Sequence, residues 1–337
     1  MPVDASDSFA ATHRYVGSLT RKATDSWLAA LLNSDDYRAR AAGLFLDGKL
    51  TGGDSLRPMD EATRNTLVQL AVGAGDPAVY AMAVYACRTD ADNSADGACP
   101  QISLRAWARL DSDNAVPWLL VARQAQEKHD EAGEMEAFVQ AAKSHKSDSY
   151  NDSLFAFAEP DLPKDVPPLE RWYLSVELLG IEAATGESQY SVAARHCSNE
   201  ALRNDNVRQQ CDALATLFVA KGASLLDLGV GAGIGARVGW PAQRVAGIKQ
   251  ERDALMQALT QAVPTENDDL WSCDTVRLGN AFMNARVRLG EVGAAREALE
   301  RSGESEQELA QKHTESLERL LHDAQQRAPE LATQPAP

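Results

Sequence analysis

Apolar residues recur at intervals of three and four along most of the chain, which is the spacing of one face of an α-helix. Clear strand-like alternation of apolar and polar residues is absent from the sequence. Isoleucine is scarce and aromatic residues make up 6% of the chain, so side chains that favour strands are few. The pattern predicts an all-α fold. Examples of the helical spacing are Trp27, Leu28, Leu31 and Leu32; Leu67, Leu70, Ala71 and Ala74; and Val207, Cys211, Leu214, Leu217 and Phe218.

Helix starts repeat in the first half of the chain. We expect helices from Asp35, from Gly75 and from Asp111, and the second has Asp76 as its N-cap and Pro77 in its first turn. When the three segments are aligned on Asp36, Asp76 and Asp113, they lie about 40 residues apart, a period typical of stacked helix pairs. The spacing therefore predicts a helical repeat.

One segment resembles a known repeat. In residues 114–142 large and small side chains alternate as in a tetratricopeptide-like (TPR/Sel1-like) repeat, although His129 stands where the inter-helix glycine is usual and Glu134 where a small residue is usual. Residues 289–303 resemble the second helix of another such repeat. The resemblance covers well under a third of the chain and implies an irregular TPR-like α-solenoid of antiparallel helix pairs. The matching positions are Trp118, Val121, Ala122, Ala125, Phe138 and Ala141.

Prolines and composition divide the chain into five parts. Four prolines lie between residues 144 and 169 and interrupt the helical pattern, which predicts a Pro-rich connector. We expect a partly ordered N-terminal segment over 1–22 and helical repeats over 23–143. After the connector, we expect further helical repeats and a capping helix over 170–327, and a disordered tail over 328–337.

The glycine-rich stretch "SLLDLGVGAGIGARVGW" over 224–240 has two interpretations. It resembles the first motif of S-adenosylmethionine-dependent methyltransferases, in which a strand ends at an acidic residue and a glycine turn follows. That resemblance implies a cofactor loop formed by Asp227, Gly229, Gly231 and Gly233. However, Lys249 stands where that family places an acidic residue for the ribose hydroxyls, and an ammonium group cannot accept those hydrogen bonds.

The same stretch fits a helix better. Ser224 and Asp227 have the spacing of a capping box, and the glycines recur four residues apart. Interior glycines cost roughly 1 kcal/mol each relative to alanine, so a close helix–helix contact has to offset them. We therefore predict a helix over 224–239, packed through its glycine face, in which Gly233→Leu overpacks the contact.

The five cysteines include two pairs, each separated by a short polar segment. Cys87 and Cys99 form one pair, and Cys197 and Cys211 form the other. Each pair has the spacing of a disulfide that joins two helices across a turn, which would contribute roughly 3 kcal/mol. The alternative is that all four are buried thiols, the ordinary state in a reducing cytosol. We predict that each pair is close in space and that Cys273 is buried.

No catalytic, cofactor or metal site is evident in the sequence. There is no G-x-S-x-G, C-x-x-C or HExxH pattern, and the histidines have no partner spacing. The formal net charge of −16 disfavours nucleic acid as a partner, and no apolar run is long enough to span a bilayer. The histidines stand at 13, 129, 145, 196, 313 and 322.

The C-terminal segment from Ser305 to about Arg327 is predicted to form one amphipathic helix. Ser305 and Glu308 make a capping box at its start, and an apolar stripe follows. We expect this helix to close the end of the core; the alternative is that its stripe meets a partner or a second copy of the chain.

Taken together, the patterns favour a non-catalytic helical-repeat protein that binds another protein. Two alternatives stay open: a methyltransferase using the 225–235 loop, and a disulfide-stapled envelope or secreted binding protein. The N-terminal residues contain no apolar run typical of a secretion signal, so we expect a cytoplasmic protein. If the chain is a trimmed mature form, a periplasmic or secreted location replaces that expectation.

Overall fold

A computed structural model describes residues 5–47, 49–50, 59–88, 97–150, 152–185, 189–263 and 271–331 of the protein. This part of the chain contains fifteen α-helices, three short 3₁₀ helices and no β-strand, which confirms the all-α prediction. Among these helices, none combines the length and the hydropathy needed to cross a bilayer. The helices are α1 (Ala5–Leu32), α2 (Tyr37–Leu46), α3 (Glu61–Ala74), α4 (Pro77–Arg88), α5 (Leu104–Leu110), α6 (Ala115–Glu127), α7 (Glu131–Lys143), α8 (Ser153–Ala158), α9 (Pro168–Thr185), α10 (Gln189–His196), α11 (Asp205–Lys221), α12 (Leu225–Val238), α13 (Ala242–Ala262), α14 (Cys273–Ser302) and α15 (Glu306–Leu331).

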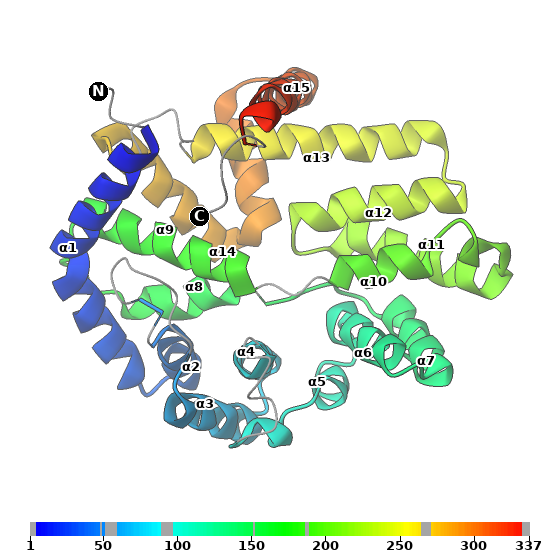
Figure 1. The fold of residues 1–337 in the computed structure, drawn as a ribbon, viewed down its shortest axis with the longest axis horizontal. Helices are drawn as coiled ribbons and strands as arrows, with labels where there is room; N and C mark the ends of the chain where they lie inside the picture. Colours follow the sequence, from blue (N-terminus) through cyan, green and yellow to red (C-terminus); the bar gives the residue numbers. More distant parts are fainter. Residues whose placement is uncertain are drawn as a thin grey trace.

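The helices follow a curved path. In Figure 1, α1 to α7 run from the left of the view along the bottom to the right, and α8 and α9 lie inside this curve. Consecutive helices pack on one another in several places, as α6 does on α7 and α11 on α12. Contacts between α1 and α9, and between α9 and α14, bring the beginning and the end of the chain together.

The predicted helix starts of the first half are largely confirmed. Asp36 caps α2 by accepting from the Arg38 amide at 2.9 Å, and Asp76 caps α4 by accepting from the Ala78 amide at 2.9 Å. The third helix begins later than expected, with Asn114 as its N-cap. Asp111 lies before that helix and forms an ion pair with Lys146 at 3.0 Å.

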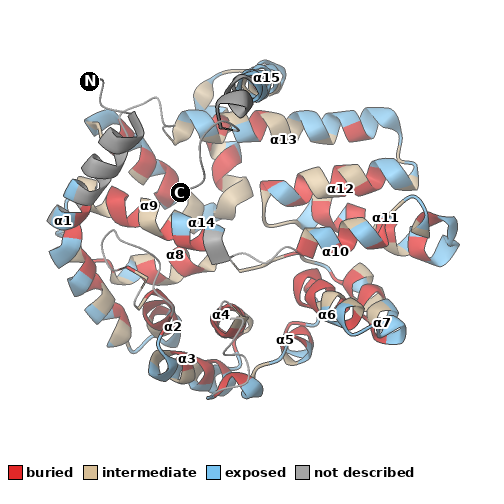
Figure 2. Ribbon diagram, in the orientation of Figure 1, coloured by how far each residue is buried: buried red, intermediate tan, exposed pale blue. Residues whose placement is uncertain are grey.

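One core extends through most of the molecule. All ten residues from Ala78 to Cys87 of α4 are buried, so this helix is covered on every side (Figure 2). Three tryptophans, Trp27, Trp107 and Trp172, are at most 1% exposed. The indole N–H of Trp27 donates to the carbonyl oxygen of Ala158 at 2.9 Å, which satisfies a buried donor and joins α1 to α8.

The segment expected to be a connector is an ordered part of the core. Residues 144–150, called the strap below, link the start of α6 to the start of α12. The amide of Ala115 donates to the Lys146 carbonyl at 2.9 Å, and that of Ala223 donates to the Ser147 carbonyl at 3.0 Å. Beyond the strap, the short helix α8 is held by burial of Leu154 and Phe155.

Two expected boundaries fall inside helices. The limit between 22 and 23 lies within α1, which runs without interruption from Ala5 to Leu32. The limit between 327 and 328 lies within α15, and residues 332–337 of the expected tail lie outside the described residues. The expected boundaries follow changes in composition, but a helix continues as long as its backbone hydrogen bonds do.

The C-terminal helix forms as predicted, and only its start is covered. Ser305 and Glu308 make the capping box: the Ser305 amide donates to Glu308 Oε2 at 2.9 Å. Leu309 is fully buried among small residues of α13 and α14. Three leucines further along the same helix are 45–64% exposed, so the predicted cap accounts for the first turns alone. They are Leu317, Leu320 and Leu321.

Candidate functional site

A cavity of about 530 Å³ opens where the strap, α9, α10, α12, α13 and α14 meet. This volume falls within the range of small-ligand sites. We call it the junction cavity. Its charged and amide lining residues come from segments far apart in the sequence: Asp148, Asp152, Glu182, Gln189, Arg286 and Glu291.

A break in α14 positions two of these side chains. Gly290 has φ 70° and ψ 179°, a conformation outside the helical region that glycine adopts most readily. The break gives the amide of Glu291 a partner outside its own helix, and this amide donates to Asp152 Oδ2 at 3.2 Å. Arg286, one turn earlier, and Glu291 therefore both reach the cavity from the same helix.

Arg286 lies between two carboxylates. Its Nη2 contacts Asp152 Oδ1 and lies 2.9 Å from Glu182 Oε2. Burial alone would lower the pKa of Arg286, but the charges of Glu182 and Asp152 hold this pKa above its ordinary value. Glu182 also accepts from the Phe155 amide at 3.3 Å, yet burial raises the pKa of its carboxyl group to about 7.

The start of α12 forms a second wall. Ser224 and Asp227 make the predicted capping box, and Ser147 of the strap donates to Asp227 Oδ1 at 3.2 Å. Burial raises the pKa of Asp227 to about 6, although these hydrogen bonds lower it. The Leu225 amide donates to Glu291 Oε1 at 3.2 Å, so α12 and α14 are joined at the cavity.

Negative charge exceeds positive charge in the cavity. Asp148, Asp152, Glu182 and Glu291 line it, and Arg286 is the single cation among its lining residues. Burial raises the pKa of Asp148 and of Glu291, because a carboxylate loses hydration there. Among the described residues, no group of acidic, histidine or cysteine side chains converges as metal ligands do. The cavity therefore combines charged side chains with apolar ones, such as Leu179 and Leu226, on its wall.

A second cavity of about 400 Å³ adjoins the first. It shares Leu179, Arg286 and Glu291 with the junction cavity, and the rest of its wall is mainly apolar, including Leu259 and Phe282. Arg286 and Glu291 therefore lie at the boundary between the two cavities.

The glycine-rich stretch is a helix, and the methyltransferase interpretation is wrong. Residues Leu225–Val238 form α12, which ends at Gly239 in the left-handed conformation. Lys249, which stands where that family places an acidic residue, lies inside the helix α13. Asp227 caps the helix, and Gly229, Gly231 and Gly233 lie inside it, so residues 225–235 form no cofactor loop.

Only some of the glycines make the predicted close contact. A Cβ on Gly231 would lie 2.8 Å from Val219 Cγ2 and 3.0 Å from the Ala215 carbonyl oxygen, so α12 approaches α11 at this residue. A Cβ on Gly235 would meet the Trp240 ring at 2.3 Å. Gly233 has no neighbouring atom within 4 Å, so the prediction that Gly233→Leu overpacks a contact is wrong.

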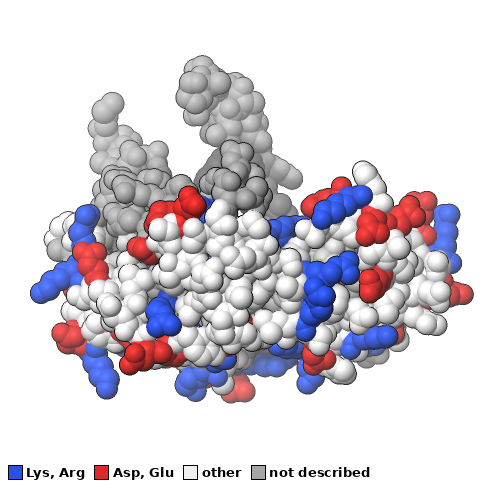
Figure 3. Space-filling view, turned by 90° about the horizontal axis from the view of Figure 1, so that it is seen from below, with Lys and Arg blue, Asp and Glu red and all other residues white. Residues whose placement is uncertain are grey.

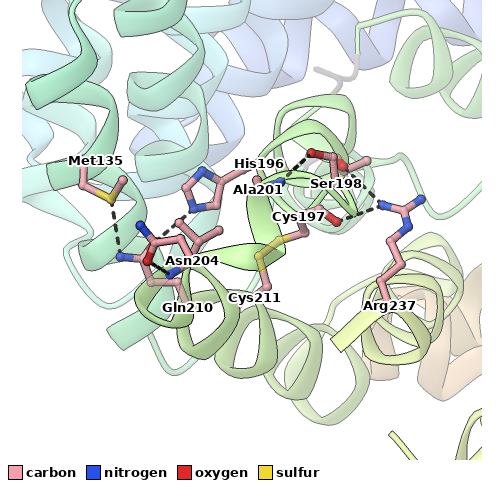
Figure 4. Close-up of a disulfide and its surroundings, with 11 residues drawn as sticks. Met135, His196, Cys197, Ser198, Ala201, Asn204, Gln210, Cys211 and Arg237 are labelled. Carbon is pink, nitrogen blue, oxygen red and sulfur yellow. Dashed lines mark hydrogen bonds between the residues drawn. A yellow bond between two sulfur atoms is a disulfide. The ribbon is translucent and has the colours of Figure 1, made fainter. Parts of the chain in front are cut away.

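The cysteine pairs lie close together and are bonded. The Cα atoms are 5.7 Å apart in both Cys87–Cys99 and Cys197–Cys211. Figure 4 shows the second bond, which joins the residue after α10 to α11, with Arg237 of α12 donating to the Cys197 carbonyl at 3.4 Å. Cys273 is exposed in the first turn of α14, so its predicted burial is wrong.

Two of the described histidines, His145 and His196, contact neighbours outside the junction cavity. His196 is buried, stacks on Phe138 with ring centroids 3.5 Å apart, and contacts Gln210 Oε1 at 2.9 Å. Burial lowers its pKa, because the charged ring would lose hydration in the core. His145 contacts Asp113 at the surface. Neither ring reaches the junction cavity.

Sequence reasoning missed the residues that form the cavity. Arg286 and Glu291 lie in an ordinary-looking helical stretch, and Glu182 lies in an apolar one. One signal was present: Gly290 and Gly293 interrupt the helical pattern directly beside Glu291.

No protein-family model matches the chain, and neither a curated protein nor a solved structure matches it. The tetratricopeptide-like resemblance therefore rests on its own residues.

Proposed function

We propose that the protein is a non-catalytic binding module that recognises another protein at the junction cavity. The observation that carries the proposal is the apolar rim of this charged pocket. Leu226 and Met256 line the cavity and are 59% and 38% exposed. Exposed apolar side chains beside a pocket are typical of surfaces that bind a partner, because burying them on binding is favourable.

Binding accounts for the polar side chains better than catalysis does. A carboxyl group with a pKa near 7 can serve as a general base. However, Glu182 Oε1 accepts from a backbone amide and Oε2 pairs with Arg286. Both oxygens are thus engaged within the fold, and the described lining residues include no histidine or cysteine.

An irregular TPR-like α-solenoid of antiparallel helix pairs is the scaffold that we propose for this module. Its support is the pair α6 and α7, which packs closely over the segment that resembles the repeat. His129 has φ 57° at the turn between them, where the repeat usually has glycine. Stacked helix pairs of this kind provide extended surfaces for proteins and peptides.

The charge distribution supports a protein as partner in preference to nucleic acid. On the face seen in Figure 3, acidic and basic side chains are interspersed, and the drawn residues form no continuous basic patch there. A chain of net charge −16 repels a phosphate backbone, because binding would bring like charges together.

Selection from a displayed library of random heptapeptides tests the proposal. We expect the immobilised protein to enrich peptides whose binding is lost in the variant Leu226→Ser. Leu320→Ser is the matched control, since Leu320 is 64% exposed on α15, outside the cavity wall. If no peptide is enriched, or if Leu320→Ser alone abolishes binding, the cavity is not the recognition site.

We propose in addition that the protein works in an oxidising compartment. Two disulfides that each join neighbouring helices support this, because such bonds persist where thiols are not kept reduced. Thiol counting on denatured protein from its native source tests it. One reactive thiol per chain before reduction, that of Cys273, is the expected result, and five thiols before reduction would contradict it.

A further inference from the structure

The junction cavity has one cation and four carboxyl groups, and the cation is already engaged. Arg286 pairs with Asp152 and Glu182. Asp148 and Glu291 remain, and neither forms an ion pair within the described part of the chain. Their hydrogen bonds come from uncharged backbone amides, those of Tyr150 and Leu225. The cations whose charges act on these two half-buried carboxyl groups, Lys146 and Arg286, are each paired with other carboxylates, so the cavity keeps an excess of carboxyl groups.

Two buried polar groups at the same cavity also lack hydrogen-bond partners. Gln189 is 3% exposed, and its Oε1 has no partner among the described residues. The Arg286 side chain is 10% exposed, and its Nη1 likewise has no described partner, although Nη2 is paired. Buried polar groups nearly always form hydrogen bonds. An unpaired acceptor, Gln189 Oε1, and an unpaired donor, Arg286 Nη1, at the same cavity therefore point to a ligand that bonds to both.

We infer that the junction cavity binds the cationic side chain of a lysine or arginine residue in a partner's peptide. This inference rests on the proposed function and names the chemistry that the site recognises. The ammonium or guanidinium group donates to Asp148, Glu291 and Gln189 Oε1. A carbonyl oxygen of the same peptide accepts from Arg286 Nη1. A single basic residue of the peptide thereby supplies a positive charge for the carboxyl groups, a donor for Gln189 and an acceptor for Arg286.

The rim indicates a peptide as the source of the cation. A free amine would bring the charge, but it would leave Leu226 and Met256 as exposed as before. A peptide places an apolar neighbour of its basic residue on these two side chains, and that contact removes apolar surface from water. An anionic ligand is disfavoured, because it would enter beside the carboxyl groups of Asp148 and Glu291.

The peptides recovered by the library selection provide the test. We expect a lysine or arginine at one fixed position in them. Replacing that lysine with acetyl-lysine removes the charge but keeps the length, and we expect the Kd measured by fluorescence anisotropy to rise at least tenfold. Glu291→Gln and Asp148→Asn each keep the oxygen that accepts the backbone hydrogen bond, and each should raise Kd several-fold. Glu318→Gln, on an exposed glutamate of α15, should leave Kd unchanged.

The alternatives give distinct results. Peptides that bind without a basic residue, or an acetyl-lysine peptide of unchanged Kd, would overturn the inference and leave the proposed function standing. An empty selection would overturn both. Free n-butylammonium should displace the peptide only at concentrations at least a hundredfold above those of the unlabelled peptide; displacement at equal concentration would show that the site takes a free amine. The acetyl-lysine comparison needs no protein variant, so it holds even if a cavity variant fails to fold.

Discussion

At the scale of the residue, the main feature of this protein is a set of carboxyl groups buried around one arginine. Burying an ion pair costs hydration free energy, and the attraction between the two charges compensates for only part of this cost. Such pairs are therefore seldom a source of stability. Here Glu182, Asp148 and Glu291 all have a raised pKa because of burial. The fold therefore retains these groups at a cost in free energy. This cost supports the proposal that the junction cavity is a binding site for a partner protein.

The pKa of Glu182 makes stability depend on pH in a defined direction. Its carboxyl group has a pKa of about 7 in the folded chain and an ordinary value of 4.5. Between these values the folded state binds more protons than the unfolded state, so the free energy of unfolding falls as pH rises. Glu182→Gln removes this titration while it keeps an oxygen for the Phe155 amide.

We therefore expect the free energy of unfolding of the wild type to fall relative to that of Glu182→Gln between pH 5 and pH 8, by roughly 2 kcal/mol. Denaturant unfolding at several pH values measures this difference. The groups that face Glu182 are Asp152 and Arg286, and they are the same in both proteins. A wild-type stability that rises with pH relative to the variant would contradict the account, and Glu318→Gln should show no such change.

At the scale of the helix, α12 contains one glycine that allows close helix packing, Gly231, and one that makes no such contact, Gly233. Gly231 allows contact with α11, because a Cβ there would lie 3.0 Å from a backbone oxygen that cannot easily move. Gly233 faces open space and gives only conformational freedom to the unfolded chain. We expect Gly231→Ala to lower the free energy of unfolding by about 1–3 kcal/mol and Gly233→Ala to raise it by about 0.5–1 kcal/mol. Thermal or denaturant unfolding of both variants measures these changes. Equal changes in the free energy of unfolding would contradict the different roles assigned to the two glycines.

The helix α15 allows a similar comparison along one apolar stripe. Leu309 is fully buried and Leu320 is 64% exposed. Leu309→Ala should lower the free energy of unfolding by about 2–4 kcal/mol, because it leaves a cavity between α13 and α15. Leu320→Ala should change it by less than about 0.5 kcal/mol. A large loss of stability in Leu320→Ala would show that the whole stripe packs in the native protein.

Helices could be predicted from the sequence because their signals are local. The capping box of Ser224 and Asp227, the caps Asp36 and Asp76, and the spacing of apolar residues all act within a few residues. The role of each glycine in α12 could not be predicted, because it depends on whether α11 or solvent lies opposite. The exposure of Cys273 was missed for the same reason.

At the scale of the whole molecule, the junction cavity exists because distant segments meet. The Asp152 side chain contacts the Glu291 amide across 139 residues of sequence, and Ser147 contacts Asp227 across 80. No local pattern encodes such a meeting, so the sequence alone predicted no site there. The strap joins the start of α6 to the start of α12, and the Cys197–Cys211 bond joins the end of α10 to α11, so two connections hold segments that border the cavity.

Hydrogen–deuterium exchange with and without a selected peptide tests the central claim most directly. If the junction cavity is the recognition site, the bound peptide slows exchange in the amides of 223–226, 189–190 and 286–291. Exchange along 315–322 of α15 then stays unchanged, although that helix has exposed leucines. Protection confined to α15, with no change around the cavity, would show that the partner binds elsewhere and would contradict the account.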